Sequence, residues 1–230
     1  LKKNNNKTPF CVGNIATAEA AKKLYNSGAD IIKVGIGPGS ICTTRMVAGI
    51  GVPQISAIVE VKKALKNKNI KIISDGGIKF SGDIAKALAA GADAIMMGSI
   101  FAGTHESPGK KFKVKGKFFK SYRGMGSIGA MSSGSANRYF QKNLKDKSKL
   151  VAEGVEGRVA FKGNVSKIIY QLKGGLRSSM GYIGAKNLNQ ISKNAKFVKI
   201  TKAGFYESMV HSVEITDKTI NFKLWLLKFW

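Results

Sequence analysis

Cysteine, histidine and acidic residues are scarce in this sequence of 230 residues. Its two cysteines, Cys11 and Cys42, are too few for the disulfide framework of a small secreted domain. Its two histidines, His105 and His211, have no metal-ligating residue at a usable spacing, so we interpret both as structural or surface residues. No secretory signal opens the sequence. A reducing, cytoplasmic location is therefore predicted.

Long apolar runs are also missing. No apolar stretch reaches the roughly 18 residues that a spanning helix needs, so no membrane span is predicted. Residues 217–230 end in FKLWLLKFW and are interpreted as an atypical apolar tail, suited to docking on a neighbour or a membrane surface. Hydrophobic residues still make up 43% of the chain, enough for one core or part of a larger barrel. The first residue is Leu1 rather than Met, which predicts a longer parent protein.

The shortage of acidic residues leaves a large positive charge. Only 13 residues are acidic whereas 39 are Lys or Arg, which gives a net charge of +26. One interpretation is binding to nucleic acid, a membrane or another anionic partner. The other is a compositional bias, because Lys and Asn recur along the whole chain, in KKNNNK, KNKNIK and KDKSK. No nucleic-acid-binding motif accompanies the charge, so we favour the bias and keep nucleic-acid binding as the alternative.

One pattern of strand and helix is repeated in the first part of the sequence. Apolar segments predict buried strands, and each of the first three is followed by a segment that predicts a helix. Thr17 is placed to cap the first helix. The predicted strands are residues 9–16, 30–37, 70–77 and 93–99, and the predicted helices are 17–29, 55–67 and 81–92. This alternation indicates an α/β fold with a parallel sheet covered on both faces.

From about residue 105 the pattern changes. Residues 110–124 (KKFKVKGKFFKSYRG) predict a β-hairpin with exposed lysines. Residues 127–165 are rich in Gly, Ser and Lys with little periodicity, which predicts a long mobile segment, and such segments usually have a function. Residues 165–184 and 187–195 predict helices, and the remainder has no regular pattern.

Glycines follow each predicted strand, in GN, GIGPG, DGG and GS. Ligands of parallel α/β folds bind at the carboxyl ends of the strands, and glycine-rich loops let phosphate approach backbone N–H groups. Asp75 offers an acceptor for a ribose diol, Gly98 and Ser99 offer an N–H and a hydroxyl, and SYRGMGS adds Tyr122. Each motif alone is also compatible with a plain turn. In series they predict a site for one phosphate and one ribose, hence a nucleotide.

Cys42 is the candidate nucleophile. It lies in GIGPGSICTTR, a polar loop in which a buried structural cysteine is not expected. Backbone donors and the positive charge of Arg45 nearby favour a thiolate. Cys11 lies inside an apolar strand, so we interpret it as a small buried hydrophobic residue.

A series of specific motifs runs from about residue 9 to about residue 216: GIGPGSICTTR, GVPQISAI, SDGGIKFSGDIAKALAAGADAIMMGS, SYRGMGS, NRYF, EGVEGRV and GGLRSSMGYIGA. Together they closely resemble the IMP dehydrogenase family. The resemblance implies a TIM (β/α)8 barrel, of which residues 1–216 supply the last four βα units. It implies that residues 127–165 form a mobile flap. The first four strands, and the CBS modules that the family usually inserts there, are absent from this sequence.

The resemblance also implies a reaction, the NAD-dependent oxidation of IMP to xanthosine monophosphate (XMP) in guanine nucleotide biosynthesis. Cys42 would attack C2 of the purine, hydride would leave to NAD, and water would hydrolyse the covalent intermediate once the flap has moved in. The NRYF motif supplies Arg138 as the implied general base, paired with Tyr139. Thr44 would help to position the water.

Binding residues carried over from the resemblance form three groups. The implied IMP contacts are Ser40, Asp75, Gly76, Gly77, Gly98, Ser99 and Tyr122, with Gly124, Met125, Gly126 and Glu153 at the base. The implied NAD contacts are Gly35, Ile36 and Gly37. A potassium (K+) site would use carbonyls of Gly37, Gly39 and Cys42, completed by Glu207, Ser208 and Met209 of a neighbouring subunit. The last group implies a homotetramer.

Two alternatives stay open. GMP reductase shares the barrel, the cysteine loop and the phosphate site, but it reduces GMP with NADPH and releases ammonia. It lacks the Arg–Tyr flap, so NRYF and MGYIGA favour the dehydrogenase. The other alternative is an inactive truncated fragment, because an intact Cys42, Asp75 and Arg138 do not by themselves make an active enzyme.

Overall fold

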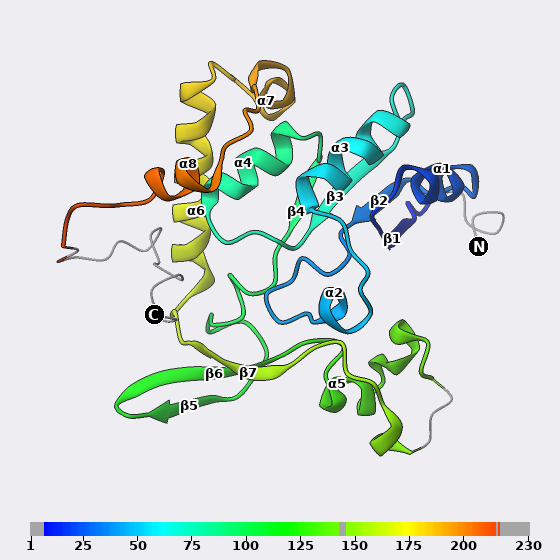
Figure 1. The fold of residues 1–230 in the computed structure, drawn as a ribbon, viewed down its shortest axis with the longest axis vertical. Helices are drawn as coiled ribbons and strands as arrows, with labels where there is room; N and C mark the ends of the chain where they lie inside the picture. The colour runs from blue at the N-terminus through cyan, green and yellow to red at the C-terminus, as the bar shows by residue number, and fades with distance from the viewer. Residues whose placement is uncertain (1–6, 143–145, 215, 217–230) are drawn as a thin grey trace.

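Four parallel strands form the main sheet, in the same order in space as in the sequence (Figure 1). The computed structural model describes residues 7–142, 146–214 and 216. The strands are β1 (Cys11–Ile15), β2 (Ile31–Val34), β3 (Lys71–Asp75) and β4 (Ala94–Met96). Each lies inside a segment predicted to be a strand, so the predicted α/β fold with a parallel sheet is confirmed.

The predicted helices follow the first three strands. They are α1 (Ala18–Asn26), α3 (Gln54–Ala64) and α4 (Ser81–Ala89). Thr17 caps α1 as predicted, since its Oγ1 accepts a hydrogen bond from Ala20 N at 3.3 Å. Two further predicted helices, α6 (Val165–Tyr182) and α7 (Leu188–Asn194), pack against α4 (Figure 1). The helices thus form a layer beside the main sheet.

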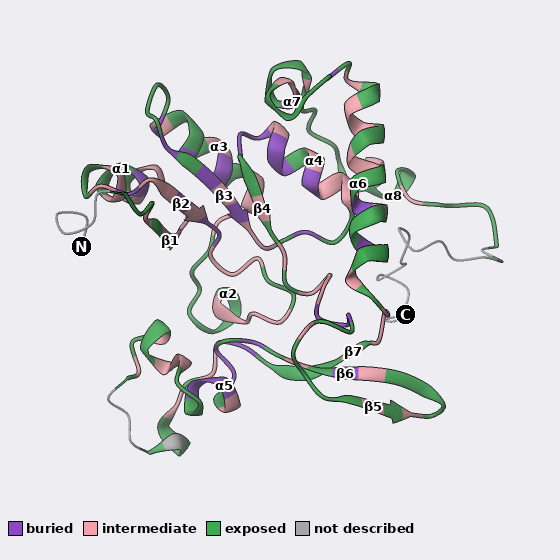
Figure 2. Ribbon diagram, turned by 180° about the vertical axis from the view of Figure 1, so that it is seen from behind, coloured by how far each residue is buried: buried purple, intermediate pink, exposed green. Residues whose placement is uncertain are grey.

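The hydrophobic core lies between this helix layer and the main sheet. Ile32 and Val34 of β2 and Ile72 of β3 are almost fully buried, in one cluster with Ile58 and Val61 of α3. Figure 2 shows the buried residues concentrated on β3, α3 and α4. Full burial of one such side chain contributes about 1.5–3 kcal/mol, so this cluster is the main source of stability.

Helices cover one face of the main sheet rather than the predicted two. Side chains alternate along the strands, and positions between the buried ones, such as Lys33 and Asp75, are only half-buried. Lys33 Nζ lies 3.4 Å from Asp75 Oδ2 on this second face. The reason is the strand order, because consecutive parallel strands joined by right-handed crossovers receive their helices on one side.

Cys11 is exposed, so its interpretation as a buried residue is wrong. Within the described part of the chain, β1 pairs only with β2 and forms an edge of the main sheet. An edge strand leaves part of its surface to solvent, and an apolar stretch of sequence does not reveal which strand will be the edge.

A second, antiparallel sheet lies beyond the carboxyl ends of the main sheet (Figure 1). Its strands are β5 (Lys111–Val114), β6 (Lys117–Arg123) and β7 (Glu156–Ala160). The predicted hairpin is confirmed as β5 and β6. β7 comes from the segment predicted to lack regular structure, and it pairs with β6 from Arg123–Glu156 to Phe119–Ala160. Such long-range pairing leaves no local signal in the sequence.

Other short elements also escaped prediction. They are α2 (Thr44–Val47), α5 (Ile128–Ser132), α8 (Lys202–Glu207) and 3-10 helices at Ser135–Tyr139 and Lys147–Lys149. Elements of three to six residues are too short to show a hydrophobic period. Among the described residues, no helix combines the length and apolar character needed to cross a membrane. The tail predicted at 217–230 lies outside the described residues.

Replacing Ile72 tests the core. Ile72 is 1% exposed, so Ile72→Ala leaves a cavity, and we expect the free energy of unfolding to fall by about 2–5 kcal/mol. Urea denaturation followed by circular dichroism measures the change. Ile50→Ala is the control, because Ile50 is 61% exposed, and its expected effect is below about 0.5 kcal/mol. Equal losses in both variants would contradict this description of the core.

Candidate active site

A cavity of about 310 Å³ opens at the carboxyl ends of the four parallel strands, where α/β folds bind ligands. Residues at all four strand ends line it, and segments 122–126, 138–139 and 153–154 close it from the side of the second sheet. The lining includes most of the predicted site residues: Gly35, Gly37, Gly39, Ser40, Cys42, Asp75, Gly76, Gly77, Gly98, Ser99, Tyr122, Gly124, Met125, Gly126, Arg138, Tyr139 and Glu153.

Cys42 lies just before α2, and a neighbouring hydroxyl holds its thiol. Cys42 Sγ donates a hydrogen bond to Thr44 Oγ1 at 3.1 Å. The amide of Cys42 donates to Gly39 O at 3.1 Å and closes the tight turn. Thr44 is not part of the cavity lining, so its described contact with the site is this bond to the thiol. The surroundings of the thiol are polar, as the loop sequence predicts.

Backbone hydrogen bonds join the cysteine loop to two distant segments. Thr43 N donates to Glu153 O at 2.9 Å, and Val155 N donates to Ile41 O at 3.1 Å. Glu153 N in turn donates to Gly126 O at 2.9 Å. Three segments therefore lie side by side as three layers, namely residues 39–43, 153–155 and 124–127. We call this arrangement the backbone stack.

Glycines make the backbone stack possible. A Cβ on Gly126 would lie 2.8 Å from Tyr139 Cζ and 2.9 Å from the carbonyl carbon of Glu153. A Cβ on Gly124 would lie 3.3 Å from Gly154 Cα. Real Cβ atoms rarely approach other heavy atoms this closely, so a side chain at these positions would push the layers apart.

Asp75 ends β3 and is held from two sides. Asn14 Nδ2 donates to Asp75 Oδ2 at 2.8 Å, and Lys33 Nζ lies 3.4 Å from the same oxygen. Asn14 Nδ2 also donates to Gly35 O at 2.9 Å, so this amide joins the ends of three strands. Sequence analysis missed Asn14, although its place at the carboxyl end of a strand is the signal that singled out Asp75.

Tyr122 reaches from β6 to the loops of the main sheet. Its side chain forms a hydrogen bond with Ser40, and its hydroxyl lies 3.4 Å from where a Cβ on Gly98 would be. Burial raises the pKa of Tyr122, and the bond with Ser40 offsets part of that rise. Its neutral phenol is a hydrogen-bond donor for an anion. Lys79 and Arg123 also line the cavity and add positive charge. They lie in the motifs SDGGIKFSGD and SYRGMGS, but were assigned no role from the sequence.

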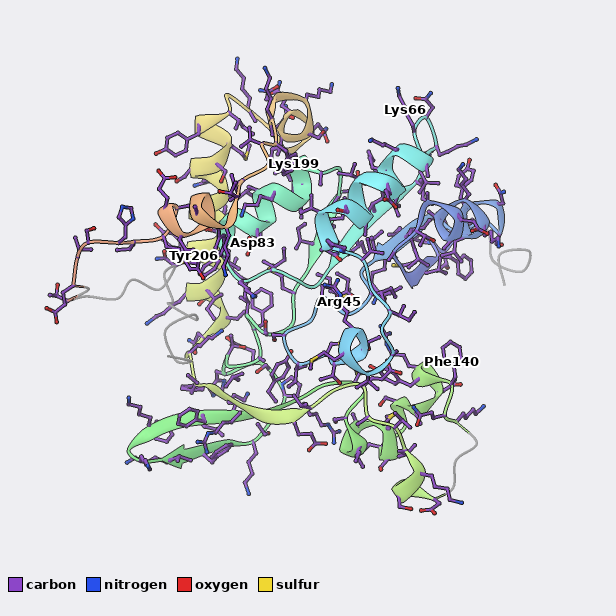
Figure 3. All side chains as sticks on the ribbon, viewed as in Figure 1. Arg45, Lys66, Asp83, Phe140, Lys199 and Tyr206 are labelled. Carbon is purple, nitrogen blue, oxygen red and sulfur yellow. The ribbon has the colours of Figure 1, made fainter. Side chains whose placement is uncertain are left out.

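Arg138 and Tyr139 enter the cavity from the short helix after α5. Burial raises the pKa of the Tyr139 phenol; the Arg138 guanidinium opposes that rise, and the charges of Cys42 and Glu153 add to it. The phenol therefore lies close to both the thiol and the guanidinium. The next residue, Phe140, is fully exposed and points into solvent (Figure 3).

Arg45 braces the cysteine loop and is not part of the cavity lining (Figure 3). Its Nε donates to Ile36 O at 3.1 Å, and its Nη2 donates to Val52 O at 2.6 Å. A Cβ on Gly37 would lie 2.7 Å from Arg45 Cγ, so the arginine packs directly on that glycine. The described hydrogen bonds of Arg45 thus go to the loop backbone, and its effect on the thiolate stays a prediction. Ile36 also lies outside the lining, with its side chain against the core.

The last predicted cation ligands lie away from the cavity in this chain. Glu207 ends α8, and Ser208 and Met209 follow it. In Figures 1 and 2, α8 is drawn over α6 and away from α2, into which the cysteine loop leads. Carbonyls at a helix end lack helical partners, and Met209 O lies 2.8 Å from His211 Nδ1. Among the described residues, no group of three or more His, Cys, Asp or Glu side chains is placed to hold a metal.

Comparison with known sequences identifies relatives. The family model described as IMP dehydrogenase / GMP reductase domain matches residues 1–211. The chain is 55% identical over 212 residues to inosine-5'-monophosphate dehydrogenase from Streptococcus pyogenes, which covers 92% of this chain and 43% of that protein. It is 57% identical over 219 residues to inosine-5'-monophosphate dehydrogenase from Methanocaldococcus jannaschii, which covers 93% of this chain and 44% of that protein.

A solved structure has a similar fold. It is the crystal structure of a variant of GMP reductase from Trypanosoma brucei in complex with guanosine 5'-monophosphate, with a TM-score of 0.82 and 46% sequence identity. The match covers 91% of this chain and 42% of that chain. The chain thus spans less than half the length of the relatives that it matches.

Gly126→Ala tests the backbone stack. The added Cβ meets the backbone of Glu153, which cannot move aside as a flexible side chain does. We expect the bond from Glu153 N to Gly126 O to open, and the Glu153 amide to exchange with solvent at least about tenfold faster. Hydrogen exchange followed by NMR measures this rate. Gly157→Ala is the control, because a Cβ there meets no atom. An unchanged Glu153 rate in Gly126→Ala would refute the close packing.

Titration of Tyr139 tests the balance of burial and charge in the cavity. The phenol should ionise above its ordinary pKa of 10.0. Arg138→Gln removes a positive charge that stabilises the phenolate, so it should raise the pKa further. Phenolate absorbance, compared between each protein and its Tyr139→Phe counterpart, isolates this tyrosine. Arg158→Gln is the control, because that guanidinium lies over Phe119. A lower pKa in Arg138→Gln is the contrary result.

Proposed function

This chain belongs to the IMP dehydrogenase / GMP reductase family, and we propose that it catalyses the NAD-dependent oxidation of IMP to XMP. One observation carries the proposal. The thiol of Cys42 shares a single cavity with Asp75, Tyr122 and the Arg138–Tyr139 pair. The reaction needs four kinds of group, and these residues supply them in the same order: a nucleophile, a hydrogen-bond acceptor for ribose, a hydrogen-bond donor for phosphate, and a pair of side chains that activates water.

The proposed substrate, IMP, contacts three walls of the cavity. The carboxylate of Asp75 accepts hydrogen bonds from the ribose diol, with Gly76 and Gly77 beside it. Ser40, Gly98, Ser99 and Tyr122 bind the phosphate, and the bond between Ser40 and Tyr122 supports this grouping. The backbone of Gly124, Met125 and Gly126, with Glu153, faces the base. A cavity of about 310 Å³ has the volume of a small ligand site.

In the first step, a bond forms between Cys42 Sγ and C2 of the purine. As this bond forms, the thiol proton passes to N3 of the purine, and it is released to solvent when hydride leaves C2. Thr44 Oγ1 lies 3.1 Å from the sulfur and orients the sulfur toward the substrate. Hydride then leaves C2, so that a thioimidate links the purine to Cys42. When bound, NAD supplies the acceptor for this hydride and becomes NADH.

In the second step, a C2–O bond replaces the C2–S bond. We assign Arg138 the removal of a proton from water, with Thr44 helping to position that water. Burial keeps the Tyr139 phenol protonated, so it is a hydrogen-bond donor beside Arg138. Water adds to C2, the sulfur leaves and regains a proton, and XMP is released. Residues 127–165 act as a flap that moves between the two steps.

The described residues fit one edge of an NAD site. Gly35 and Gly37 line the cavity, and we propose that the nicotinamide lies near them, with Ile36 between. Glycine at position 35 is also required by the fold itself, because a Cβ on Gly35 would clash with Asp75 O. The rest of the cofactor is expected to bind outside the described residues.

The proposed K+ site uses carbonyl oxygens, which are suitable ligands for this ion. Gly37, Gly39 and Cys42 lie on one loop that lines the cavity, and we propose their carbonyl oxygens as the ligands. Glu207, Ser208 and Met209 lie at the carboxyl end of α8, where helix carbonyls carry partial negative charge. Because that end is remote from the loop in this chain, a neighbouring subunit must supply it. A homotetramer is therefore part of the proposal.

We also propose that the main sheet is half of a (β/α)8 barrel, with residues 1–216 as its C-terminal part, residues 127–165 as the flap and 217–230 as a separate tail. Consecutive parallel strands with helices on one face support this, because that is the arrangement in such barrels. So does the chain's coverage of less than half of its relatives. The two free cysteines are compatible with the reducing cytoplasm that we propose.

GMP reductase is the second candidate, favoured by the TM-score of 0.82 to a member with that activity. In this case the same cysteine would serve the reduction of GMP by NADPH, with release of ammonia. The Arg138–Tyr139 pair in the cavity supports the dehydrogenase instead, because water must be activated only in that reaction. An inactive fragment remains the third candidate.

IMP-dependent formation of NADH tests the proposed function. We expect the chain to form NADH faster with potassium, and Cys42→Ala to abolish the reaction because the covalent step is lost. Mass spectrometry of the quenched reaction should find a purine adduct on Cys42. Cys11→Ala is the control, because Cys11 is exposed on β1 outside the cavity lining, and it should leave the rate unchanged.

Other results would point to the alternatives. Oxidation of NADPH that depends on GMP, without NADH formation from IMP, would support GMP reductase. A folded chain that is inert with both nucleotides would support the inactive fragment. Activity that survives Cys42→Ala would rule out the covalent mechanism.

A further inference from the structure

A lysine holds the loop that carries two of the proposed phosphate ligands. Gly98 and Ser99, in the loop after β4, line the cavity. Lys162 does not line it, but its Nζ donates to Ile100 O at 2.7 Å and to Ser99 O at 3.4 Å. The ammonium thus binds the loop through its carbonyl groups, from outside the cavity.

A second ammonium holds the rest of this loop. Lys120 is 4% exposed, and its Nζ donates to Thr104 O at 2.9 Å, to His105 O at 3.4 Å and to Ser107 O. Three carbonyls satisfy this buried charge, which would otherwise be costly. Lys120 lies on β6 two residues before Tyr122, so the loop is tied to the strand that supplies another proposed phosphate ligand.

The peptide groups of the loop can carry the effect of Lys162 to the cavity. In a trans peptide the N–H points opposite to the C=O, so an ammonium on Ser99 O fixes the Ile100 N–H in the opposite direction. Phe101 N and Ala102 N both donate to Gly98 O at 3.0 Å, which makes a tight turn that begins at the cavity. The peptide dipoles of the turn are therefore aligned between two charges. The ammonium lies at their carbonyl end, and an anion bound at the start of the turn would lie at their N–H end.

We propose that Lys162 is a positioning residue for the substrate phosphate, acting through the loop at 97–107 without touching the phosphate. The inference rests on the proposed function, because it requires a nucleoside monophosphate in the cavity. Lys120 fixes the far end of the same loop against β6. In this arrangement, neutral N–H and O–H groups of the loop contact the phosphate, and positive charge stands behind them.

Binding of IMP compared with inosine tests this role, because inosine has the same base and ribose but no phosphate. Titration calorimetry on the 230-residue chain measures both affinities. We expect Lys162→Met to weaken IMP about tenfold and to leave inosine unchanged. Lys162→Arg keeps the charge and should restore most of the loss. Lys113→Met is the control for net charge, because Lys113 is an exposed hairpin lysine whose Nζ lies over Phe118.

The outcomes separate this inference from the proposed function. If the wild type bound IMP and inosine with equal affinity, the cavity would have no phosphate site, and the proposed function would be refuted as well. A wild type that prefers IMP, with the same preference kept in Lys162→Met, would overturn only the role of Lys162. So would an equal loss of both ligands in a variant with a native circular dichroism spectrum, since that marks a purely structural effect. If Lys162→Met does not fold, Lys162→Gln replaces it in the same binding measurements, and the results are interpreted in the same way.

Discussion

Backbone-to-backbone contact among three segments is the constraint on which the site depends. In the backbone stack, the cysteine loop, residues 153–155 and residues 124–127 are joined by main-chain hydrogen bonds of 2.9–3.1 Å. Glycine at 124, 126 and 154 lets the layers approach. The contact brings the Cys42 thiol near Tyr139 and Glu153, which lie about a hundred residues later in the sequence. A site assembled in this way forms only when both sheets are in place.

The two sides of the stack differ in what stabilises them. The main sheet has a continuous apolar cluster with the helices, centred on residues such as Ile32 and Ile72. The second sheet relies on surface contacts, including stacked rings of Phe112 and Phe119 and Arg158 over Phe119. Side chains with few buried apolar contacts belong to the parts of a protein that open first. The asymmetry is compatible with a flap that moves while the cysteine loop stays on the firmer side.

The sequence predicted what local patterns encode and missed what distant contacts decide. Strand segments and their glycine ends were correct because continuous apolar runs and turn residues are local signals. The exposure of Cys11 depends on which strand is the edge, and β7 depends on pairing with β6. Gln54 was also missed, although its Nε2 donates to Val34 O at 2.8 Å and Ser74 Oγ at 3.1 Å under the site. A side chain that bridges two strands has no motif of its own.

The distribution of charge explains how so basic a chain can be selective. A net charge of +26 attracts every anion, so long-range attraction cannot choose among them. In the proposed site, the carboxylate of Asp75 repels anions and accepts hydrogen bonds from the ribose diol, while Asn14 and Lys33 hold the carboxylate in place. The proposed phosphate ligands then determine which anion remains bound. In our proposal the ammonium of Lys162 stands behind the loop, so a phosphate that fits the N–H groups of the loop is favoured over an anion that is merely negative.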